Sequence, residues 1–570
     1  MSTPPSSRRR LERPSVVTEW SIRDFKAVEH ACLPMTPLTL LLGPNSAGKS
    51  SLLQTLLILG QSTEDDIVLN GPLARLGNAE DVIRAGSEST TFGFVTRERT
   101  PARETPVNVL VEITMVNKLG SLVPSEFIAI DQETDTVLLQ ASSERVTKAA
   151  RDAVARESRR HETLLRIGRI DDKPAPPNTY IALAGMIPIA VCFRRTRNNV
   201  LSELRRTISV ERKDVQSSDQ AFETYFQLIE WLNTRERTKS AQTDTSGKFG
   251  ATLEALRRMG NTQIREILKS YVESEFPEEE WIKVPFFGFL PNSPGGRTSR
   301  QSFPPPGQNH DSAIATASFA ADSMRQIQRS LRYLGPLREE PQVVYPTGAA
   351  YRTLPTGSKG EYTADFLARN KDTRFKYWDW NGEEHRQKLS NALTRWVSYL
   401  GLGESVTVED QGKLGRGLRI RLNGAERDLT MIGVGASQLI PVIVTVLGAN
   451  QGAIVLLEQP ELHLHPSVQS RLADFFLQAR RDIRLIIETH SEYLITRLRR
   501  RVVESPELGK NLSIMFAEQS DGGVTDVRRL QLDHLGDFSA WPKGFFDTQD
   551  TESAELARAV RRAISSGAEV

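Results

Sequence analysis

The eight residues 43–50, GPNSAGKS, constrain the fold of this chain more than any other feature. They satisfy the pattern G-x-x-x-x-G-K-[ST], in which a glycine-rich turn points backbone N–H groups at phosphate oxygens. The apolar runs LTLLL before the pattern and SLLQTLLILG after it predict a strand and a helix on either side of the turn. The helix N-terminus favours an anion. We therefore expect a nucleotide here, with Lys49 near its β- and γ-phosphates and the Ser50 hydroxyl on Mg²⁺.

A second ordered region spans residues 417–492. It alternates runs of strand and helix length: GLRIRL, ASQLIPVIVTVLG, AIVLL, PSVQSRLADFFLQAR and IRLIIETH. Strands that alternate with helices indicate a mostly parallel sheet. We expect an α/β fold with a mixed sheet around a parallel core, interrupted by a long insertion between the two regions.

Composition and apolar spacing suggest how the chain is divided. Residues 144–167 and 219–237 have helical spacing, and residues 289–312 are rich in Pro, Gly and Ser, which is typical of a loop. We expect a disordered tail at 1–17, an N-terminal lobe at 18–135, a largely helical insertion at 136–330 that contains the loop at 289–312, a C-terminal lobe at 331–505 and a capping segment at 506–570.

Bulk composition excludes several classes of protein. Of the 570 residues, 39% are hydrophobic and 25% charged, and the net charge of +2 is too small for a basic coat around nucleic acid. Cys32 and Cys192 are too few for a disulfide framework, which favours a reducing compartment. No run reaches the ~18 apolar residues of a membrane span, and no secretory signal follows the N-terminal arginines. We expect a cytoplasmic protein.

The segment IVLLEQPELHLHP, residues 454–466, ends an apolar strand in Glu458. A buried carboxylate needs a partner, and magnesium held jointly with Ser50 would supply one. The alternative is a glutamate satisfied by protein groups. The next residue is Gln459, whose amide can hold a water molecule but cannot accept its proton.

Two other short segments are candidates for phosphate contacts. GVGASQ, residues 433–438, places two glycines and a serine at a helix start, which suits an anion but also a plain turn with Ser437 as N-cap. His490 follows the strand RLIIE, where a neutral imidazole could reach a γ-phosphate or the attacking water, although such a histidine is usually structural. His463 and His465 have the spacing of a metal pair but lack an evident third ligand.

Together these segments resemble the ATP-binding-cassette-like AAA ATPases of the OLD (overcoming lysogenization defect) family, relatives of RecF and SMC heads. EQPELHLHP, YLGPLREEP and the ending DHLGDFSAWPKGFFD resemble a prokaryotic branch with ATPase subunits of anti-phage systems of the Septu type. The resemblance covers residues 18–95 and 330–550.

The resemblance implies roles for individual residues. ATP would contact the phosphate loop, which comprises Gly43, Pro44, Asn45, Ser46, Ala47, Gly48, Lys49, Ser50 and Ser51. Magnesium would bind Ser50 and Glu458, with Asp81 of LGNAEDVI completing the metal site unless it is an ordinary surface charge. Gly435, Ser437 and Gln438 would form a signature that faces the γ-phosphate held by a second subunit, and His490 would be the switch histidine.

Two departures from the family pattern affect the expected activity. Too few residues follow His490 for the Toprim nuclease domain of some relatives, so we expect an ATPase that is not itself the nuclease. Gln459 stands where the general base is usual, a loss that commonly lowers rates by about 10²–10⁴. Glu461 or His490 could replace the base, or ATP could hold a long-lived closed dimer; we favour slow hydrolysis assisted by Glu461 or His490.

The expected function is that of an ATP-hydrolysing sensor subunit in anti-phage defence. It would act as a head-to-tail homodimer or higher homo-oligomer that controls a separate effector, such as a nuclease. The alternative is a RecF-like repair ATPase that clamps duplex DNA, for which the arginines in residues 194–199, 205–213 and 497–501 could supply phosphate contacts or merely form solvated faces. A transporter ATPase is disfavoured because no segment suits membrane coupling.

Overall fold

The structure is a computed structural model that describes residues 16–63, 66–99, 106–144, 146–157, 162–211, 228–232, 260–286, 308–348, 355–539 and 548–565. The predicted tail at 1–17 and loop at 289–312 lie largely outside these residues. No helix in the described ranges combines the length and apolarity needed to cross a membrane.

Five parallel strands form the centre of the main sheet. Their order is β13 (Leu331–Leu334), β19 (Ile454–Glu458), β20 (Arg484–Glu488), β3 (Leu38–Leu42) and β21 (Leu512–Gln519). All five residues of β3 are buried, as are the first four of β19, which explains their unbroken apolar sequences. The prediction of a mixed sheet with a parallel core is confirmed.

An antiparallel run of strands extends this sheet. In order of pairing it comprises β2 (Val28–Pro34), β1 (Val16–Phe25), β4 (Ser89–Arg99), β5 (Pro106–Lys118), β6 (Ser121–Asp131), β7 (Thr136–Ser142), β8 (Thr163–Ile170), β10 (Thr179–Ala184), β11 (Ile187–Thr196) and β12 (Glu279–Pro285). The two-residue strand β9 (Lys173–Pro174) pairs with β8, and β22 (Thr525–Leu530) joins β21 to β2.

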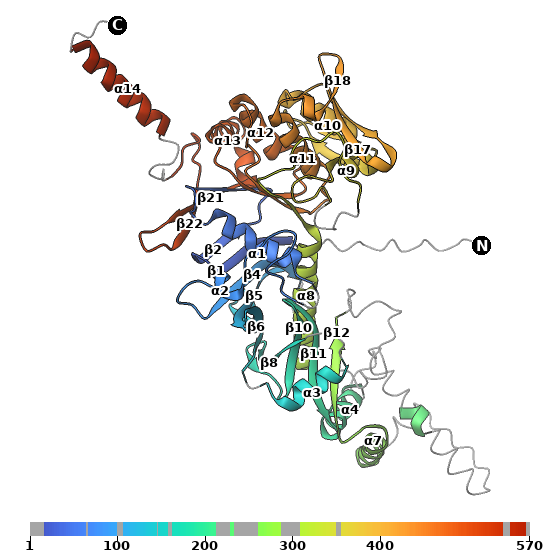
Figure 1. The fold of residues 1–570 in the computed structure, drawn as a ribbon. Helices are drawn as coiled ribbons and strands as arrows, with labels where there is room; N and C mark the ends of the chain where they lie inside the picture. Colours follow the sequence, from blue (N-terminus) through green and yellow to red (C-terminus); the bar gives the residue numbers. More distant parts are fainter. Residues whose placement is uncertain are drawn as a thin grey trace.

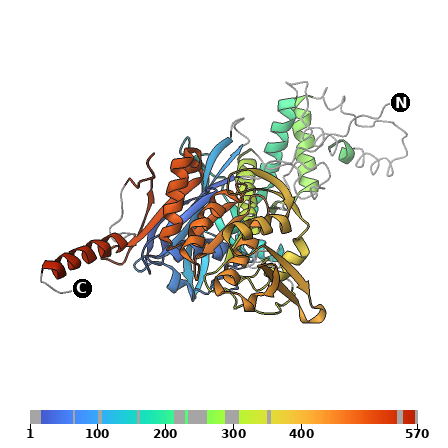
Figure 2. The same cartoon turned by 90° about the horizontal axis from the view of Figure 1, so that it is seen from above.

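Two large hydrophobic cores lie against the main sheet. One packs α1 (Lys49–Gln61) and α8 (Gln308–Ser330) against the antiparallel strands. The other packs the parallel strands against four helices seen together in Figures 1 and 2: α10 (Leu389–Leu400), α11 (Val434–Leu447), α12 (Pro466–Gln478) and α13 (Glu492–Glu504). The strand β3 contributes to the second core through Leu38, Leu40 and Leu42, so the phosphate loop that follows it starts from a rigid position.

The insertion is only partly helical. Helices α3 (Lys148–Glu157), α4 (Arg197–Glu211), α7 (Asn261–Glu275) and α8 alternate there with the strands from β7 to β12. Residues 163–167, read from sequence as the end of a helix, belong to β8. Of the predicted helix at 219–237, only residues 228–232 are described, and they are helical.

The short helix α2 (Ala79–Val82) lies beside β5. The remaining elements belong to the C-terminal half. They are α9 (Thr363–Asn370), the hairpin β14 (Arg374–Trp378) and β15 (Glu384–Lys388), the sheet of β16 (Ser405–Asp410), β17 (Arg416–Leu422) and β18 (Ala425–Asp428), the 3-10 helices η2 (Gly412–Leu414), η3 (Leu429–Met431) and η4 (Pro506–Asn511), and α14 (Thr548–Ser565). The strand predicted at GLRIRL exists as β17, but it lies in this separate antiparallel sheet and not in the parallel core.

Candidate functional site

Two glycines of the phosphate loop are required because residues of β21 and β22 pack directly against them. Gly43 has φ 139°, and a Cβ there would lie 2.0 Å from the carbonyl oxygen of Ala517 in β21. Gly48 has φ 90°, and a Cβ there would lie 2.6 Å from the Thr525 hydroxyl in β22. The loop is therefore pressed against strands from the other end of the chain, and only glycine fits these two positions.

Lys49, the first residue of α1, is 3% exposed and folds its side chain over the loop. Its Nζ donates to the carbonyl oxygens of Gly43 at 3.1 Å and Pro44 at 2.7 Å. Burial lowers the pKa of Lys49, while the nearby carboxylate of Glu488 raises it. The ammonium group is thus held at the mouth of the loop, where a phosphate would place its charge.

The Ser50 hydroxyl contacts a carboxylate that sequence analysis did not assign. Ser50 Oγ donates to Glu488 Oε2 at 2.8 Å, whereas Glu458 lies one strand further away. Glu488 is the last residue of β20, directly before Thr489 and His490. Its place at the end of the predicted strand RLIIE was the signal that could have identified it.

Glu458 and Glu488 end neighbouring parallel strands and are register partners. Glu458 Oε1 accepts a hydrogen bond from the Tyr333 hydroxyl at 2.8 Å. Burial, and then the negative charge of Glu488, raise the pKa of Glu458 to about 7. Burial also raises the pKa of Glu488, against the opposing effects of Ser50 and Lys49. The buried carboxylate of Glu488 and the half-buried carboxylate of Glu458 beside a serine hydroxyl are oxygen donors that Mg²⁺ prefers, so these residues fit the cation.

Arg338 is a second residue that sequence analysis did not single out. Its Nη2 donates to the carbonyl oxygen of Glu458 at 2.9 Å and its Nη1 to that of Gln459 at 3.0 Å. The side chain is buried, which lowers the pKa of Arg338 to about 10 while Glu461 and Glu458 raise it. Tyr333 and Arg338 both belong to YLGPLREEP, so this segment supports the acidic end of β19.

Gln459 has a left-handed backbone conformation with φ 43°. Its N–H donates to the carbonyl oxygen of Glu488 at 2.8 Å, and its own carbonyl accepts from Arg338. Few residues other than glycine, Asn and Asp adopt such a conformation readily. The contacts with Glu488 and Arg338 thus hold the chain in its turn away from the strand.

Glu461 and His490 meet at the same edge of the sheet. Glu461 is 6% exposed, and its Oε1 accepts the backbone N–H of His490 at 2.7 Å. Its Oε2 is buried without a hydrogen-bond partner, and burial raises the pKa of Glu461. Burial and the charge of Lys49 lower the pKa of His490, so its imidazole is neutral near pH 7.

The signature candidates open helix α11. Gly433 is the N-cap, so Ser437 is not the cap; it is 4% exposed and its hydroxyl donates to the Val434 carbonyl at 2.8 Å. Gln438 Nε2 donates to the Glu339 carbonyl at 3.3 Å. Both side chains therefore bond within their own chain, while Val434 is exposed beside them.

Asp81 has a local capping role, and the metal role expected for it stays a prediction. Its Oδ2 accepts the N–H of Asn78 at 2.7 Å and closes a capping box around the short helix α2. Within the described ranges, the carboxylate of Asp81 is not grouped with those of Glu458 and Glu488 closely enough to share an ion. The capping box formed by Asn78 and Asp81 explains the sequence NAED at residues 78–81.

The two histidines of the loop 459–465 also have local roles. His465 is the N-cap of α12, and its Nδ1 accepts the N–H of Ser467 at 3.3 Å. His463 has φ 62°, and its carbonyl lies 2.8 Å from where a Cβ on Gly435 would be. The loop thus contacts the first turn of α11 within one protomer.

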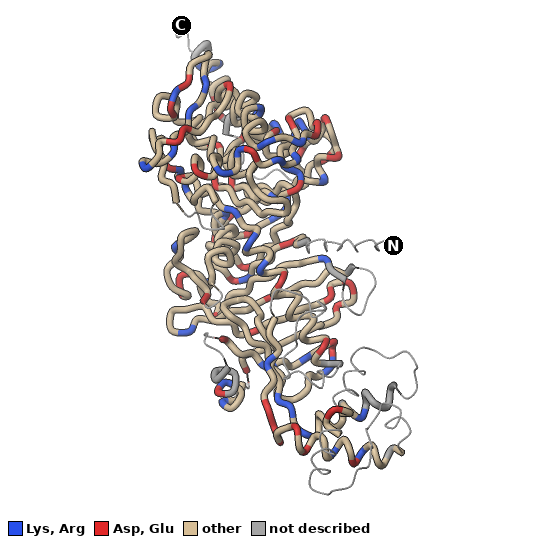
Figure 3. The backbone as a smooth tube through the Cα atoms, turned by 90° about the vertical axis from the view of Figure 1, so that its right-hand side faces the viewer, with Lys and Arg blue, Asp and Glu red and all other residues tan. Residues whose placement is uncertain are grey.

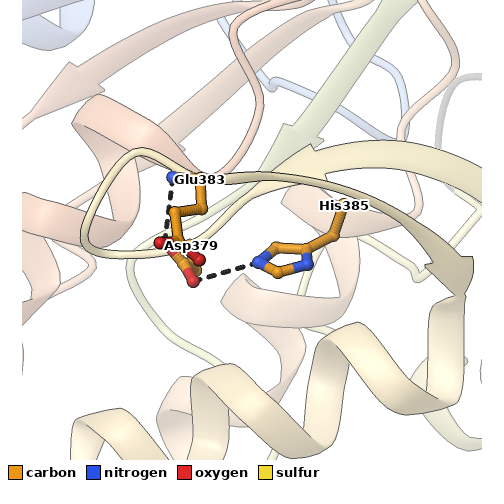
Figure 4. A group of neighbouring side chains, drawn as sticks. All are labelled: Asp379, Glu383 and His385. Carbon is orange, nitrogen blue, oxygen red and sulfur yellow. Dashed lines mark hydrogen bonds and ion pairs between the residues drawn. The ribbon is translucent and has the colours of Figure 1, made fainter.

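A separate group at Asp379, Glu383 and His385 brings metal-binding side chains together (Figure 4). Asp379 Oδ2 contacts His385 Nε2 and an Arg395 nitrogen, each at 3.0 Å. Its Oδ1 accepts the backbone N–H of Asn381 and Glu383. Because both oxygens are already engaged, the group is explained as the support of the β14–β15 hairpin.

The arginine clusters considered for DNA are largely neutralised by carboxylates. Arg194 and Arg195 pair with Glu279 and Glu280 of β12. The arginines at 497–501 form ion pairs with three carboxylates, of which Asp474 is buried and Asp537 and Glu504 are exposed. The pairs are Arg497–Asp474, Arg501–Asp474, Arg499–Asp537 and Arg500–Glu504. Most of the cluster at 205–213 has no described side chain. In Figure 3 the two signs of charge are interspersed over the upper part of the molecule.

Comparison with protein families finds one match, at residues 242–496. The family is described as "AAA domain, putative AbiEii toxin, Type IV TA system". The matched range contains α11, the acidic strand end and His490, while the phosphate loop lies before it. The similarity to this AAA family therefore covers the part of the site that lies in the C-terminal half, whereas the phosphate loop comes from the N-terminal part of the sheet.

Comparison with solved structures finds SMC heads. An Smc head domain of Pyrococcus furiosus with an extended coiled coil, bound to the C-terminal domain of ScpA, is 11% identical with a TM-score of 0.34, and the match covers 96% of this chain and 100% of that one. The SMC head domain of Thermotoga maritima is 8% identical with a TM-score of 0.31, covering 90% and 99%. No curated protein matches the chain.

Proposed function

We propose that the protein is a Mg²⁺-dependent, slowly hydrolysing ATPase that acts as the regulatory subunit of a prokaryotic anti-phage defence system. The observation that carries the ATPase assignment is the convergence of Lys49, Ser50, Glu488 and Glu458 at the phosphate loop. The family match supports the same class of protein, and its description names a toxin system.

Within this proposal each group has a separate task. The loop N–H groups and Lys49 would bind the β- and γ-phosphates. Ser50 and Glu458 would hold magnesium, with Glu488 as an added ligand or as the acceptor that orients the serine. Magnesium, when bound, would neutralise phosphate charge.

Gln459 would limit the rate of hydrolysis. Its amide could hold a water molecule but not take its proton. His490 is the better candidate for the base. Its lowered pKa keeps the imidazole ring neutral, and a neutral ring can accept a proton. Glu461 would position His490 by accepting its backbone N–H. A slow step of this kind would let ATP keep the subunit in one state until a trigger acts.

The assembly that fits this scheme is a head-to-tail dimer that controls a separate effector, such as a nuclease. The exposed residues Met431 and Val434, at 68% and 52% exposure, flank the start of α11 and would face the second subunit together with Gly435. Ser437 and Gln438 would need to exchange their contacts with Val434 and Glu339 to reach a phosphate there.

Steady-state ATP turnover tests the proposal, with wild type compared with Lys49→Ala and Gln459→Glu. We expect wild type to turn over well below the ~10 per second that is the median for enzymes. Lys49→Ala should abolish turnover, and Gln459→Glu should raise it at least tenfold, toward the ~10²–10⁴ that a general base contributes.

His490→Ala and Glu461→Gln separate the two supporting residues. Loss of turnover in His490→Ala with only a partial loss in Glu461→Gln is expected if His490 is the base and Glu461 positions it. Failure of wild type to bind ATP, or turnover of tens per second, would contradict the proposal. The DNA-clamp alternative receives no support from Arg194, Arg195, Arg497 and Arg499, because these four arginines form ion pairs within the chain.

A further inference from the structure

Helix α14 (Thr548–Ser565) projects away from the body of the molecule in both views of the ribbon (Figures 1 and 2). Each residue from 552 to 562 is exposed. Among them are Leu556 and Val560, which are 66% and 48% exposed. An isolated helix of this length is only marginally stable in water, and most helices are stabilised by a packed apolar face.

The apolar residues of α14 lie along one side. Leu556, Ala559 and Val560 have the spacing i, i+3, i+4 that places them together on a helix. Ser553 lies one turn before Leu556 on the same side, and Glu552, four residues before Leu556, borders the stripe at this end. A face of small and branched apolar side chains is suited to packing against a second helix.

The charges of α14 are divided between its two halves. Glu552 and Glu555 lie before Leu556, whereas Arg558, Arg561 and Arg562 lie after it. Acidic residues near the N-terminus and basic residues near the C-terminus also complement the helix dipole. The dipole, however, does not require an apolar stripe between the halves.

We propose that α14 pairs with α14 of a second copy of this chain, in antiparallel orientation and about a two-fold axis near Ala557. In that orientation the acidic half of each helix lies beside the basic half of the other, on both sides of the axis. In a parallel pair like charges would lie at the same height and repel. The intrahelical pair Arg558–Glu555, at 2.6 Å, is exposed and leaves both charges accessible to a partner.

This contact is independent of nucleotide and so goes beyond the proposed ATP-bound dimer. Two helices of 18 residues bury a small interface, so the contact by itself would be weak. Its effect would be to keep two copies near each other before ATP brings their sites together, because a tether raises the effective concentration of the second contact.

Disulfide trapping in the full-length protein without nucleotide tests the orientation. Leu556→Cys and Ser553→Cys would each be made in a Cys32→Ser background, which leaves Cys192 buried. In the antiparallel pair the two residues at 556 lie on the facing stripes and roughly 3 Å apart along the axis, whereas those at 553 are roughly 12 Å apart along it, beyond the reach of a disulfide. We expect Leu556→Cys to form a dimer on mild oxidation and Ser553→Cys to remain monomeric.

Sedimentation at tens of micromolar protein supplies the second measurement. The double variant Leu556→Ser and Val560→Ser should lose the nucleotide-free dimer, while Leu119→Ser, at a fully exposed leucine elsewhere, should keep it. Cross-linking of Ser553→Cys would overturn the proposal, and so would a monomeric wild type together with a Leu556→Cys variant that does not cross-link. Lys49→Ala should leave the trapping unchanged, so failure of the ATPase assignment and failure of this contact give different results.

Discussion

At the scale of single residues, the site is dominated by two like charges held close together. Glu458 and Glu488 are the last residues of two adjacent strands, and the positive groups near them are Lys49 and Arg338. Without a further cation, repulsion between the carboxylates works against the folded state whenever both are ionised. Stability should therefore depend on pH in a range where ordinary carboxylates have already lost their protons.

The pKa of Glu458 gives the sign of that dependence. In the unfolded chain the group titrates near its ordinary value of 4.5, and in the folded chain at about 7. Between these values the folded state binds more protons, so the free energy of unfolding falls as pH rises, by about 3 kcal/mol in all. Thermal unfolding in EDTA from pH 5 to pH 8 should show this loss in wild type.

Two variants check the assignment of that loss. Glu458→Gln should reduce the slope of the profile and leave the part due to Glu488 and Glu461, whereas Glu426→Gln, at an exposed carboxylate, should reproduce the wild-type profile. Magnesium with nucleotide should restore wild-type stability at pH 8. A slope that is the same in wild type and Glu458→Gln would show that another group causes it.

Arg338 supports a second prediction at this scale. Arg338→Met keeps the apolar stem but leaves the carbonyls of Glu458 and Gln459 without their charged donor. With ~1.5–3 kcal/mol for a hydrogen bond to a charged group, we expect a loss of about 3 kcal/mol in urea unfolding. The stability of Arg338→Lys should lie between those of wild type and Arg338→Met, because a single ammonium group replaces the several N–H donors of the guanidinium. Equal stabilities for Met and wild type would contradict this role.

Single residues were predictable where their role depends on neighbours in sequence. Lys49 and Ser50 follow from the spacing of the phosphate loop, because the turn and the helix start are local structures. Glu488 does not, since its contact with Ser50 joins residues 438 positions apart. Asp81 shows a second limit, because position along the chain does not reveal that its carboxylate caps a short helix.

At the scale of elements, the start of α11 is fixed by the loop 459–465. A Cβ on Gly435 would lie 2.8 Å from the His463 carbonyl, whereas a Cβ on Gly433 would meet nothing within 4 Å. Gly435→Ala should therefore push the helix and the loop apart, at a cost of about 1–3 kcal/mol. Gly433→Ala is the matched control, because it loses only the preference for glycine at the N-cap, up to about 1 kcal/mol. Urea unfolding of both variants, with ATP affinity alongside, measures the difference.

Apolar spacing predicted the elements better than it predicted their partners. The strands β3, β19 and β20 and the helices α11 and α12 lie where unbroken apolar runs indicated them. The strand β17 was also found, but a short run cannot show which sheet it joins. In the insertion, β8 follows α3 closely, and its mixed sequence TLLRIGRI gives no clear period.

At the scale of the whole molecule, the paired arginines lead to a prediction about DNA. Because Arg194, Arg497 and Arg499 already contact carboxylates, binding to duplex DNA would require breaking those pairs. We expect weak binding, with affinity that falls little between 50 and 200 mM salt compared with the ~10³–10⁵ of proteins that make 6–10 phosphate contacts. Fluorescence anisotropy with and without ATP measures it. Tight, steeply salt-dependent binding would favour the DNA-clamp alternative.

The position of β3 between β20 and β21 also bears on how the protein is made. On the ribosome, β3 is synthesised long before either neighbour, so both of its edges lack their parallel partners until residues 484–519 have emerged. An apolar strand with open edges is a site for pairing with other chains. Chains that stop early would thus keep their phosphate loop without the glutamates that complete it. They would be prone to aggregation rather than to untimely use of ATP.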